Sequence, residues 1–113
     1  MFLAEEKIND VLIEIVNLDR ATLREAEEFK KILTKNIEQG ERKIIVDLSA
    51  CEFIDSSFLG ALVHILKKVV KTNGDLKLVG FKPAVRSMFE LTRMFRVFET
   101  HSNLNEAVES YNQ

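Results

Sequence analysis

The sequence predicts one α/β domain, with a mixed, mostly parallel sheet of four or five strands and about four helices. Two observations support this prediction. Short β-branched runs alternate with segments whose apolar residues recur every three or four positions, which is typical of parallel strands joined by crossover helices. In addition, 113 residues with four glycines and one proline contain no linker, so residues 1–113 are expected to form a single domain. The expected order is β-β-α-β-α-β-α-β-α.

Two strands are predicted at the start of the chain. Residues 2–8 and 11–16 are strand-like runs, and Asn9-Asp10 between them favours a two-residue hairpin turn. Residues 11–16 are the more hydrophobic run, so this strand is expected to lie nearer the centre of the sheet.

The first helix is predicted from residue 22 onward. Thr22 and Glu25 have the spacing of a capping box, in which each side chain bonds a backbone N–H across the first turn. Gly40 is expected to end this helix in the left-handed conformation. The predicted apolar stripe consists of Leu23, Ala26, Phe29, Leu33 and Ile37.

The middle of the chain predicts a buried strand and an unusually apolar helix. Residues 43–48 are short, nearly continuous and β-branched, as expected for a strand that is covered on both faces. After Asp55, apolar residues recur at helical spacing over most of the helix circumference until Asn73-Gly74. Such a helix is either buried between layers or covers the surface of a partner.

Shorter elements complete the chain. Residues 76–81 predict a fourth strand, Pro83 fits the first position of a short third helix, and residues 96–99 are expected to form an edge strand. Ser102 or Asn103 is expected to cap a last helix. Since loops after parallel strands gather at the carboxyl edge of a sheet, the turn after the second strand and the segment around Asp55 should be neighbours.

Charge and composition narrow the classes of function. The net charge of −2 and the pI near 5.7 give no bulk attraction to nucleic acid or to an anionic membrane. We interpret Lys67, Lys68 and Lys71 as the solvated face of a helix. Cys51 is the only cysteine, which excludes an internal disulfide and a thiolate metal cluster.

The same composition predicts where the protein resides. The N-terminus lacks the basic-then-apolar order of a signal peptide. The longest apolar stretch, residues 58–70, is interrupted by charged residues and is shorter than a bilayer-spanning helix requires. We therefore expect a soluble, cytoplasmic protein.

Catalytic interpretations find little support in the sequence. We interpret His64 as a partly exposed residue of the second helix and His101 as a loop residue, and neither is expected to form a triad with a serine. Glycine motifs that cradle phosphate and the ligand spacings of metal sites do not occur. Asp47 is interpreted as structural, and not as the phosphoacceptor of a receiver domain. We expect no enzyme activity, no cofactor and no metal.

The segment Asp55-Ser56-Ser57 is the strongest candidate for a functional site. Asp and Ser are common helix caps, so a plain N-cap is one interpretation. A cap needs only one such residue, whereas here an acid and two hydroxyls precede a mostly apolar helix, where the helix dipole favours an added anion. We interpret Ser56 as a regulatory serine exposed at the start of the helix.

Residues 43–49 and 53–60 closely resemble the core of the STAS domains of bacterial anti-sigma factor antagonists. The resemblance continues through Leu18-Asp19, residues 74–79 and residues 83–86, in the same order along the chain. It implies a STAS fold and a small protein that binds an anti-sigma factor and so frees a sigma factor. It also implies that the anti-sigma factor is a serine kinase, that Ser56 is the phosphoacceptor, and that a phosphatase resets the switch.

The resemblance further implies which residues bind the partner: Asp19, Asp55, Ser57, Phe58 and Gly60. Two positions depart from the family pattern, since Phe58 and Asn17 stand where glycine is common. A large ring at the rim of the site is expected either to add apolar contact area or to crowd a partner.

Two alternatives stay open. The chain is either a STAS subunit of a larger transport or stress-sensing assembly, in which the serine is never phosphorylated, or a nucleotide-binding or weakly hydrolytic domain. The second alternative would use a pocket at the carboxyl edge of the sheet.

Overall fold

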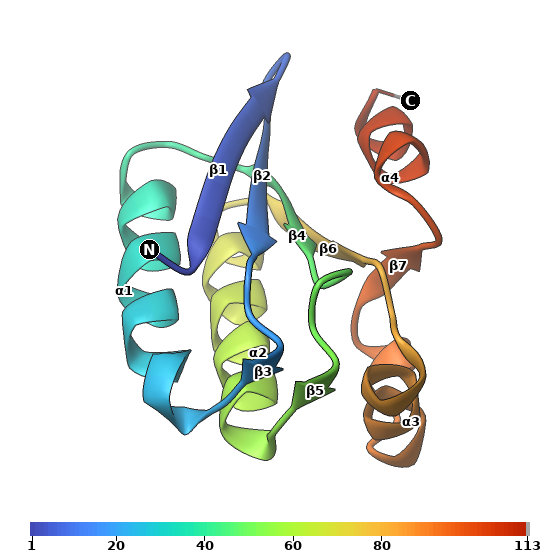
Figure 1. The fold of residues 1–113 in the computed structure, drawn as a ribbon. Coiled ribbons are helices and arrows are strands. Elements are labelled where there is room, and N and C mark those ends of the chain that lie inside the picture. The colour runs from blue at the N-terminus through green and yellow to red at the C-terminus, as the bar shows by residue number, and fades with distance from the viewer. Residues whose placement is uncertain (113) are drawn as a thin grey trace.

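The computed structural model describes residues 1–112, in which two sheets form. The larger has the strand order β1-β2-β4-β6-β7, and the smaller pairs β3 with β5. The strands are β1 (Leu3–Ile8), β2 (Val11–Val16), β3 (Arg20–Ala21), β4 (Lys43–Asp47), β5 (Phe53–Ile54), β6 (Asp75–Val79) and β7 (Glu99–His101). β1 is antiparallel to β2 and every other pair is parallel, which confirms the predicted mixed, mostly parallel sheet (Figure 1).

The helices lie on both faces of the larger sheet. They are α1 (Leu23–Glu38), α2 (Ser56–Val70), α3 (Pro83–Leu91) and α4 (Leu104–Tyr111), and the short 3₁₀ turn η1 (Met94–Arg96) follows α3. α1 and α2 lie side by side on one face, and α4 lies on the other (Figure 1). Strand residues alternate between these faces: Ile44 belongs to the core under α1 and α2, whereas Ile45 packs with Val108 of α4.

The N-terminal hairpin forms as predicted. Leu3 pairs with Val16 and Ile8 with Val11, so that Asn9-Asp10 form a two-residue turn. Asn9 has a φ of 57°, in the left-handed region that asparagine tolerates better than most residues. β2 lies between β1 and β4, which confirms that the more hydrophobic strand is the more central one.

Local chemistry also sets the ends of α1. Thr22 and Glu25 form the predicted capping box, and Gly40 follows the helix with a φ of 105°. Leu23 differs from the prediction, because its side chain is 64% exposed although its spacing places it in the apolar stripe. It is the first residue of the helix, and Ala26 is the first member of the stripe to reach the core.

The structure corrects several of the predicted strands. β3 and β5 were not predicted, since strands of two residues have no periodicity to detect. The last strand is β7 and not residues 96–99, so His101 lies in a strand and not in a loop. Arg93 turns the chain with a left-handed φ of 60°, η1 follows, and Phe98 packs on Phe89, which displaces the strand toward the C-terminus.

β6 ends earlier than the predicted residues 76–81. Gly80 has a φ of 79°, which breaks the strand, and a Cβ at this position would lie 2.6 Å from the Cβ of Ser49. The loops that follow β4 and β6 therefore touch at a glycine, at the carboxyl edge of the sheet.

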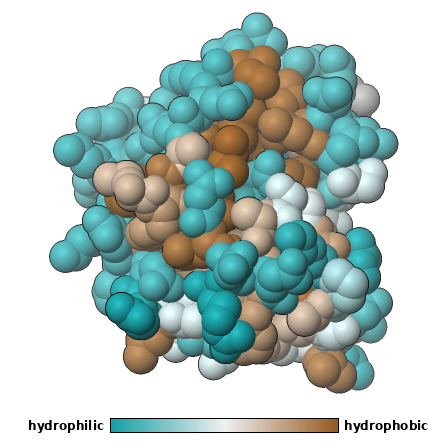
Figure 2. Space-filling model, in the orientation of Figure 1, coloured by the Kyte–Doolittle hydropathy of each residue, from teal (hydrophilic) through white to brown (hydrophobic). Residues whose placement is uncertain are grey.

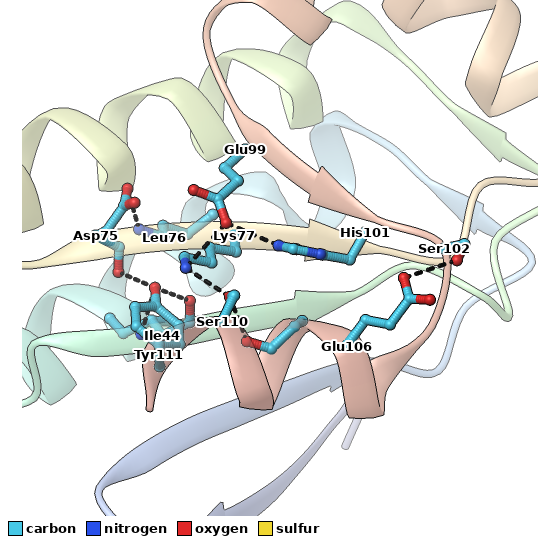
Figure 3. Close-up of polar contacts among 11 residues, drawn as sticks. Ile44, Asp75, Leu76, Lys77, Glu99, His101, Ser102, Glu106, Ser110 and Tyr111 are labelled. Carbon is cyan, nitrogen blue, oxygen red and sulfur yellow. Dashed lines mark hydrogen bonds and ion pairs between the residues drawn. The ribbon is translucent and has the colours of Figure 1, made fainter. Parts of the chain in front are cut away.

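A buried polar cluster fastens α4 to the sheet (Figure 3). Lys77 of β6 is 5% exposed, and its Nζ lies 2.6 Å from Ser110 Oγ and 2.9 Å from a carboxylate oxygen of Glu99. The ring of Tyr111 lies 4.1 Å from the same Nζ, and its hydroxyl lies 2.8 Å from the carbonyl oxygen of Ile44. Burial raises the pKa of Tyr111, so the hydroxyl stays protonated and can donate. The cluster joins β4, β6, β7 and α4.

α4 is short and covers only part of its face of the sheet. Apolar side chains are visible between the β1–β2 hairpin and α4 (Figure 2), and Ile8 of the hairpin is 39% exposed. Asn103 caps α4 by accepting a hydrogen bond from the backbone N–H of Glu106, which selects one of the two predicted caps.

Among residues 1–112, no helix combines the length and the apolar character needed to cross a membrane.

Candidate functional site

One carboxylate joins the N-termini of α1 and α2. Asp55 Oδ1 accepts a hydrogen bond from the backbone N–H of Phe58 at 2.9 Å and so caps α2. Asp55 Oδ2 accepts from the backbone N–H of Leu23, the first residue of α1, at 3.0 Å. Because both helix N-termini are partly positive, the carboxylate is stabilised from two sides. Asp55 therefore caps two helices, and its contact with a partner stays a prediction.

Backbone hydrogen bonds hold the turn after β2 against the segment around Asp55. The carbonyl oxygen of Asp19 accepts from the N–H of Glu52 at 2.7 Å and from that of Phe53 at 3.0 Å. The N–H of Asp55 donates to the carbonyl oxygen of Ala21 at 3.1 Å. The small β3–β5 sheet lies between these bonds. The predicted proximity of these two segments is confirmed.

Ser56 presents its hydroxyl at the surface. It is the first residue of α2, and its side chain is exposed, as expected from the sequence. The capping bond is accepted by Asp55, so the helix does not need the Ser56 hydroxyl in order to begin. Ser57 is half-buried beside it. The chemistry available here is that of a free primary alcohol at the positive end of a helix.

Phe58 lies inside the protein, so the expectation that its ring lies at the rim is wrong. The side chain is 0% exposed, and its ring centroid lies 4.8 Å from that of Phe29 on α1. Residues two positions apart in an α-helix differ by about 200° around its axis, so Phe58 points away from the face that presents Ser56. The ring packs α2 against α1 and has no surface left for a partner.

Gly60 lies one helical turn after Ser56 on the exposed side of α2. No heavy atom lies within 4 Å of a Cβ built at Gly60, so the helix backbone is open to approach from outside. Asp19 and Leu23 are exposed nearby, at the turn after β2 and at the start of α1. We call Asp19, Leu23, Ser56, Ser57 and Gly60 together the serine surface.

Leu23 is the member of this surface that the sequence did not indicate. Its spacing matches the buried stripe of α1, and no local signal separates it from the core residues. Its backbone N–H bonds to Asp55, which is 32 residues away along the chain, so its surroundings are set by tertiary structure. An exposed leucine beside Ser56 adds an apolar contact to an otherwise polar surface.

Other candidate groups do not form a reactive site. His101 Nε2 bonds to a Glu99 carboxylate oxygen at 2.7 Å in the cluster that holds α4. Cys51 is buried, and burial raises the pKa of its thiol to about 11, so it is not a reactive thiolate. Within residues 1–112, no group of three His, Cys, Asp or Glu side chains is placed to hold a metal ion.

A hollow of about 230 Å³ lies at the carboxyl edge of the sheet, where the nucleotide-binding alternative places its pocket. Asp47, Ser49, Gly80, Asn103 and their neighbours line it, and its described lining contains no lysine or arginine. Asp47 Oδ1 accepts a hydrogen bond from the backbone N–H of Ser49 at 2.9 Å, consistent with the structural role expected for Asp47. The N-terminus of α4 is the part of this lining that favours an anion, and none of the lining side chains among residues 1–112 carries a positive charge to pair with a phosphate group.

Comparison with known proteins places this site in a family. The family model described as the STAS domain matches residues 18–107. A protein named as a candidate anti-sigma factor antagonist, BtrV of Bordetella bronchiseptica, is 29% identical over 115 residues, which cover 98% of this chain and 95% of the relative. A protein of Thermotoga maritima named as a candidate antagonist of the same kind is 32% identical over 103 residues, 90% of each chain.

Solved structures agree with the sequence comparison. The crystal structure of a candidate anti-sigma factor antagonist from Thermotoga maritima matches with a TM-score of 0.91 at 28% identity, covering 98% of this chain and 95% of that one. The serine segment, the fold and the matched length therefore point the same way: the chain belongs to the STAS domain family of bacterial anti-sigma factor antagonists.

Proposed function

We propose that this protein is an anti-sigma factor antagonist that is switched by phosphorylation of Ser56. With Ser56 unmodified, the serine surface binds an anti-sigma factor that is also a serine kinase, and a sigma factor is freed. Phosphorylation of Ser56 by that kinase ends the binding, and a phosphatase restores it. The observation that carries the proposal is the exposed Ser56 hydroxyl at the first position of α2, in a chain of this family.

Charge explains why the modification changes binding more than folding. A phosphate on Ser56 adds about −1.5 to −2 charges at neutral pH. The neighbouring Asp55 carboxylate already accepts hydrogen bonds from two helix N-termini, and the first turn of α2 offsets part of the new repulsion. The fold is therefore expected to survive, while a partner surface matched to a neutral hydroxyl meets a dianion.

The size of the effect follows from the affinity scale. A loss of about 3 kcal/mol at the interface weakens binding more than a hundredfold, because each 1.4 kcal/mol is about a factor of ten. A single phosphate with this effect would therefore shift the binding equilibrium strongly toward the free proteins.

Two substitutions at Ser56 test the switch by calorimetry against each candidate anti-sigma factor kinase of the source organism. Ser56→Asp is expected to keep the native circular dichroism spectrum and to lose binding more than a hundredfold. Ser56→Ala is expected to bind like the unmodified protein and to stay bound in the presence of ATP. Ser57→Ala is the matched control and should still be switched off by ATP. Unimpaired binding by Ser56→Asp would count against the charge mechanism.

Intact mass after incubation with kinase and ATP separates the alternatives. One added phosphate that is absent from Ser56→Ala and present in Ser57→Ala supports the switch. A protein that enters a larger assembly without any mass change supports a STAS subunit that is not phosphorylated. A shift in melting temperature with ATP alone, without a kinase, supports the nucleotide-binding alternative.

A further inference from the structure

A shallow groove runs between the outer faces of α1 and α2, which lie side by side (Figure 1). Its hollow has a volume of about 300 Å³ and is lined by α1 residues from Glu27 to Glu38 and by His64 of α2. Three lysines of α1 belong to this lining. Of α2, only His64 lines the hollow. Lys67, Lys68 and the C-cap residue Lys71 extend the surface beyond it, because their spacing of three and four residues places them on the same face of the helix as His64. We call this surface the lysine groove, with six lysines: Lys30, Lys31, Lys35, Lys67, Lys68 and Lys71.

The lysines of the groove differ from the other lysines of the chain in their partners. Each of the four lysines outside it has a carboxylate within 3.0 Å, in the pairs Lys7–Glu41, Lys43–Asp10, Lys77–Glu99 and Lys82–Glu52. Of the six in the groove, only Lys30 has a carboxylate partner among residues 1–112, Glu27 at 2.7 Å. The α2 segment contains no acidic residue at all. A chain with a net charge of −2 thus concentrates its uncompensated ammonium groups on one face.

The electrostatics at His64 agree with a positive surface. Partial burial lowers the pKa of His64, and the neighbouring charges of Lys30 and Lys68 lower it further. The imidazole is therefore neutral at physiological pH, and the lysines supply the positive charge of the groove.

The groove continues the serine surface along α2. Ser56, Gly60, His64, Lys67 and Lys71 follow one another at helical spacing on the exposed side of α2. The distance from Ser56 to Lys71 is about 22 Å at 1.5 Å per helical residue. An extended peptide of about seven residues covers this length.

We propose that the lysine groove binds an acidic segment of the partner that recognises Ser56. This inference rests on the proposed function and names a second contact for the same partner. Glu27 and Glu38 interrupt the groove on its α1 side, so the positive charge is discontinuous. A continuous phosphate backbone would meet these carboxylates at close quarters, whereas a peptide with spaced Asp and Glu side chains can reach the lysines between them.

Two triple variants with the same change in charge test the groove. Lys31→Gln/Lys68→Gln/Lys71→Gln removes three charges from the groove, and Lys7→Gln/Lys43→Gln/Lys82→Gln removes three charges elsewhere. The probe is a synthetic octaglutamate peptide, titrated into the ¹⁵N-labelled full chain. Shifts confined to α1 and α2, together with at least tenfold weaker binding by the groove variant and less than twofold by the control variant, support the proposal. Equal losses in both variants overturn it, because they show a response to net charge alone.

The same titration with oligouridylate and with phosphatidylglycerol vesicles tests the other polyanions, and tighter binding of either one than of octaglutamate overturns the assignment to a peptide.

The kinase that binds the unmodified protein separates the two proposals. If Ser56→Asp abolishes binding of the kinase and the groove variant binds the kinase as tightly as the control variant does, the proposal for the lysine groove fails and the proposed function stands. If Ser56→Asp binds normally, the proposed switch fails, whatever the groove does.

Discussion

Gly60 occupies the interior of α2 although no neighbouring atom prevents a larger residue. Glycine inside a helix costs about 0.5–1 kcal/mol relative to alanine. Packing does not require it, and the absent side chain leaves the helix backbone beside Ser56 open to approach. We therefore predict that Gly60→Ala raises the free energy of unfolding by about 0.5–1 kcal/mol, measured by urea denaturation, and weakens binding of the kinase.

Gly74 provides the matched control for this substitution. A Cβ there would lie 2.4 Å from the carbonyl oxygen of Arg42 and 2.6 Å from Cγ2 of Val69, so Gly74→Ala must displace backbone or core and is expected to destabilise the protein. Loss of stability in Gly60→Ala would show that this glycine has a structural role.

At the level of the elements, a single side chain links the N-termini of α1 and α2. The Asp55 carboxylate accepts one hydrogen bond from the backbone N–H of Phe58 in α2 and another from that of Leu23 in α1. Each capping bond contributes about 1 kcal/mol. Asp55→Ala is thus predicted to cost about 2 kcal/mol of unfolding free energy, and to speed hydrogen exchange at Leu23 and Phe58 together.

Thr22→Ala is the control for Asp55→Ala, since it removes only the side-chain N-cap of α1 and leaves α2 unchanged. Its expected cost is about 1 kcal/mol. Asp55→Ser should retain the cap of α2 and lose the link to α1, because a hydroxyl has one oxygen. An equal cost for Thr22→Ala and Asp55→Ala would contradict the double cap.

For the molecule as a whole, one buried acid is expected to shape the dependence of stability on pH. Glu14 of β2 is 1% exposed and faces α1, where Asn36 Nδ2 donates to its Oε2 at 2.7 Å. Its Oε1 has no hydrogen-bond partner among residues 1–112. Burial, together with Glu5 directly opposite on β1, raises the pKa of Glu14 to about 8. The carboxyl group is therefore mostly protonated at neutral pH in the folded protein.

The sign of the effect follows from linkage. The folded pKa of about 8 lies above the ordinary value of 4.5, so this stabilising contribution is complete below pH 4.5 and is lost progressively as the pH rises from there through 8. Glu14→Gln is predicted to gain stability over the unsubstituted protein by up to about 1.4 kcal/mol per pH unit between roughly pH 5 and 8. Urea denaturation at both ends of this range measures the gain.

Glu6→Gln is the control for Glu14, because Glu6 is an exposed residue of the same hairpin. The pH dependence of its difference from the unsubstituted protein is the baseline against which that of Glu14→Gln is measured. A Glu14→Gln difference that is the same at pH 5 and pH 8 would show that the buried acid is ionised throughout.

Much of the fold was predictable because it depends on bonds between near neighbours in the chain. The hairpin at Asn9-Asp10, the capping box at Thr22 and the start of α3 at Pro83 all formed where the sequence indicates. The exposure of Ser56 was predictable for the same reason, since the residue after an Asp cap is the first of its helix. The displacement of β7 was not, because it depends on how Phe98 packs against Phe89.

By itself, the sequence determined the class of fold, the order along the chain of the α-helices and of the strands of the larger sheet, and the serine on which the proposed function depends. These follow from spacing and from capping within a few residues. Only the tertiary structure decided that Phe58 is buried, that Leu23 is exposed, and that Asp55 caps two helices. It also placed two sets of lysines on a shared face of α1 and α2. The physical reason is common to all of these: burial and electrostatic pairing depend on what lies across the gap between elements, and residues far apart in the chain supply it.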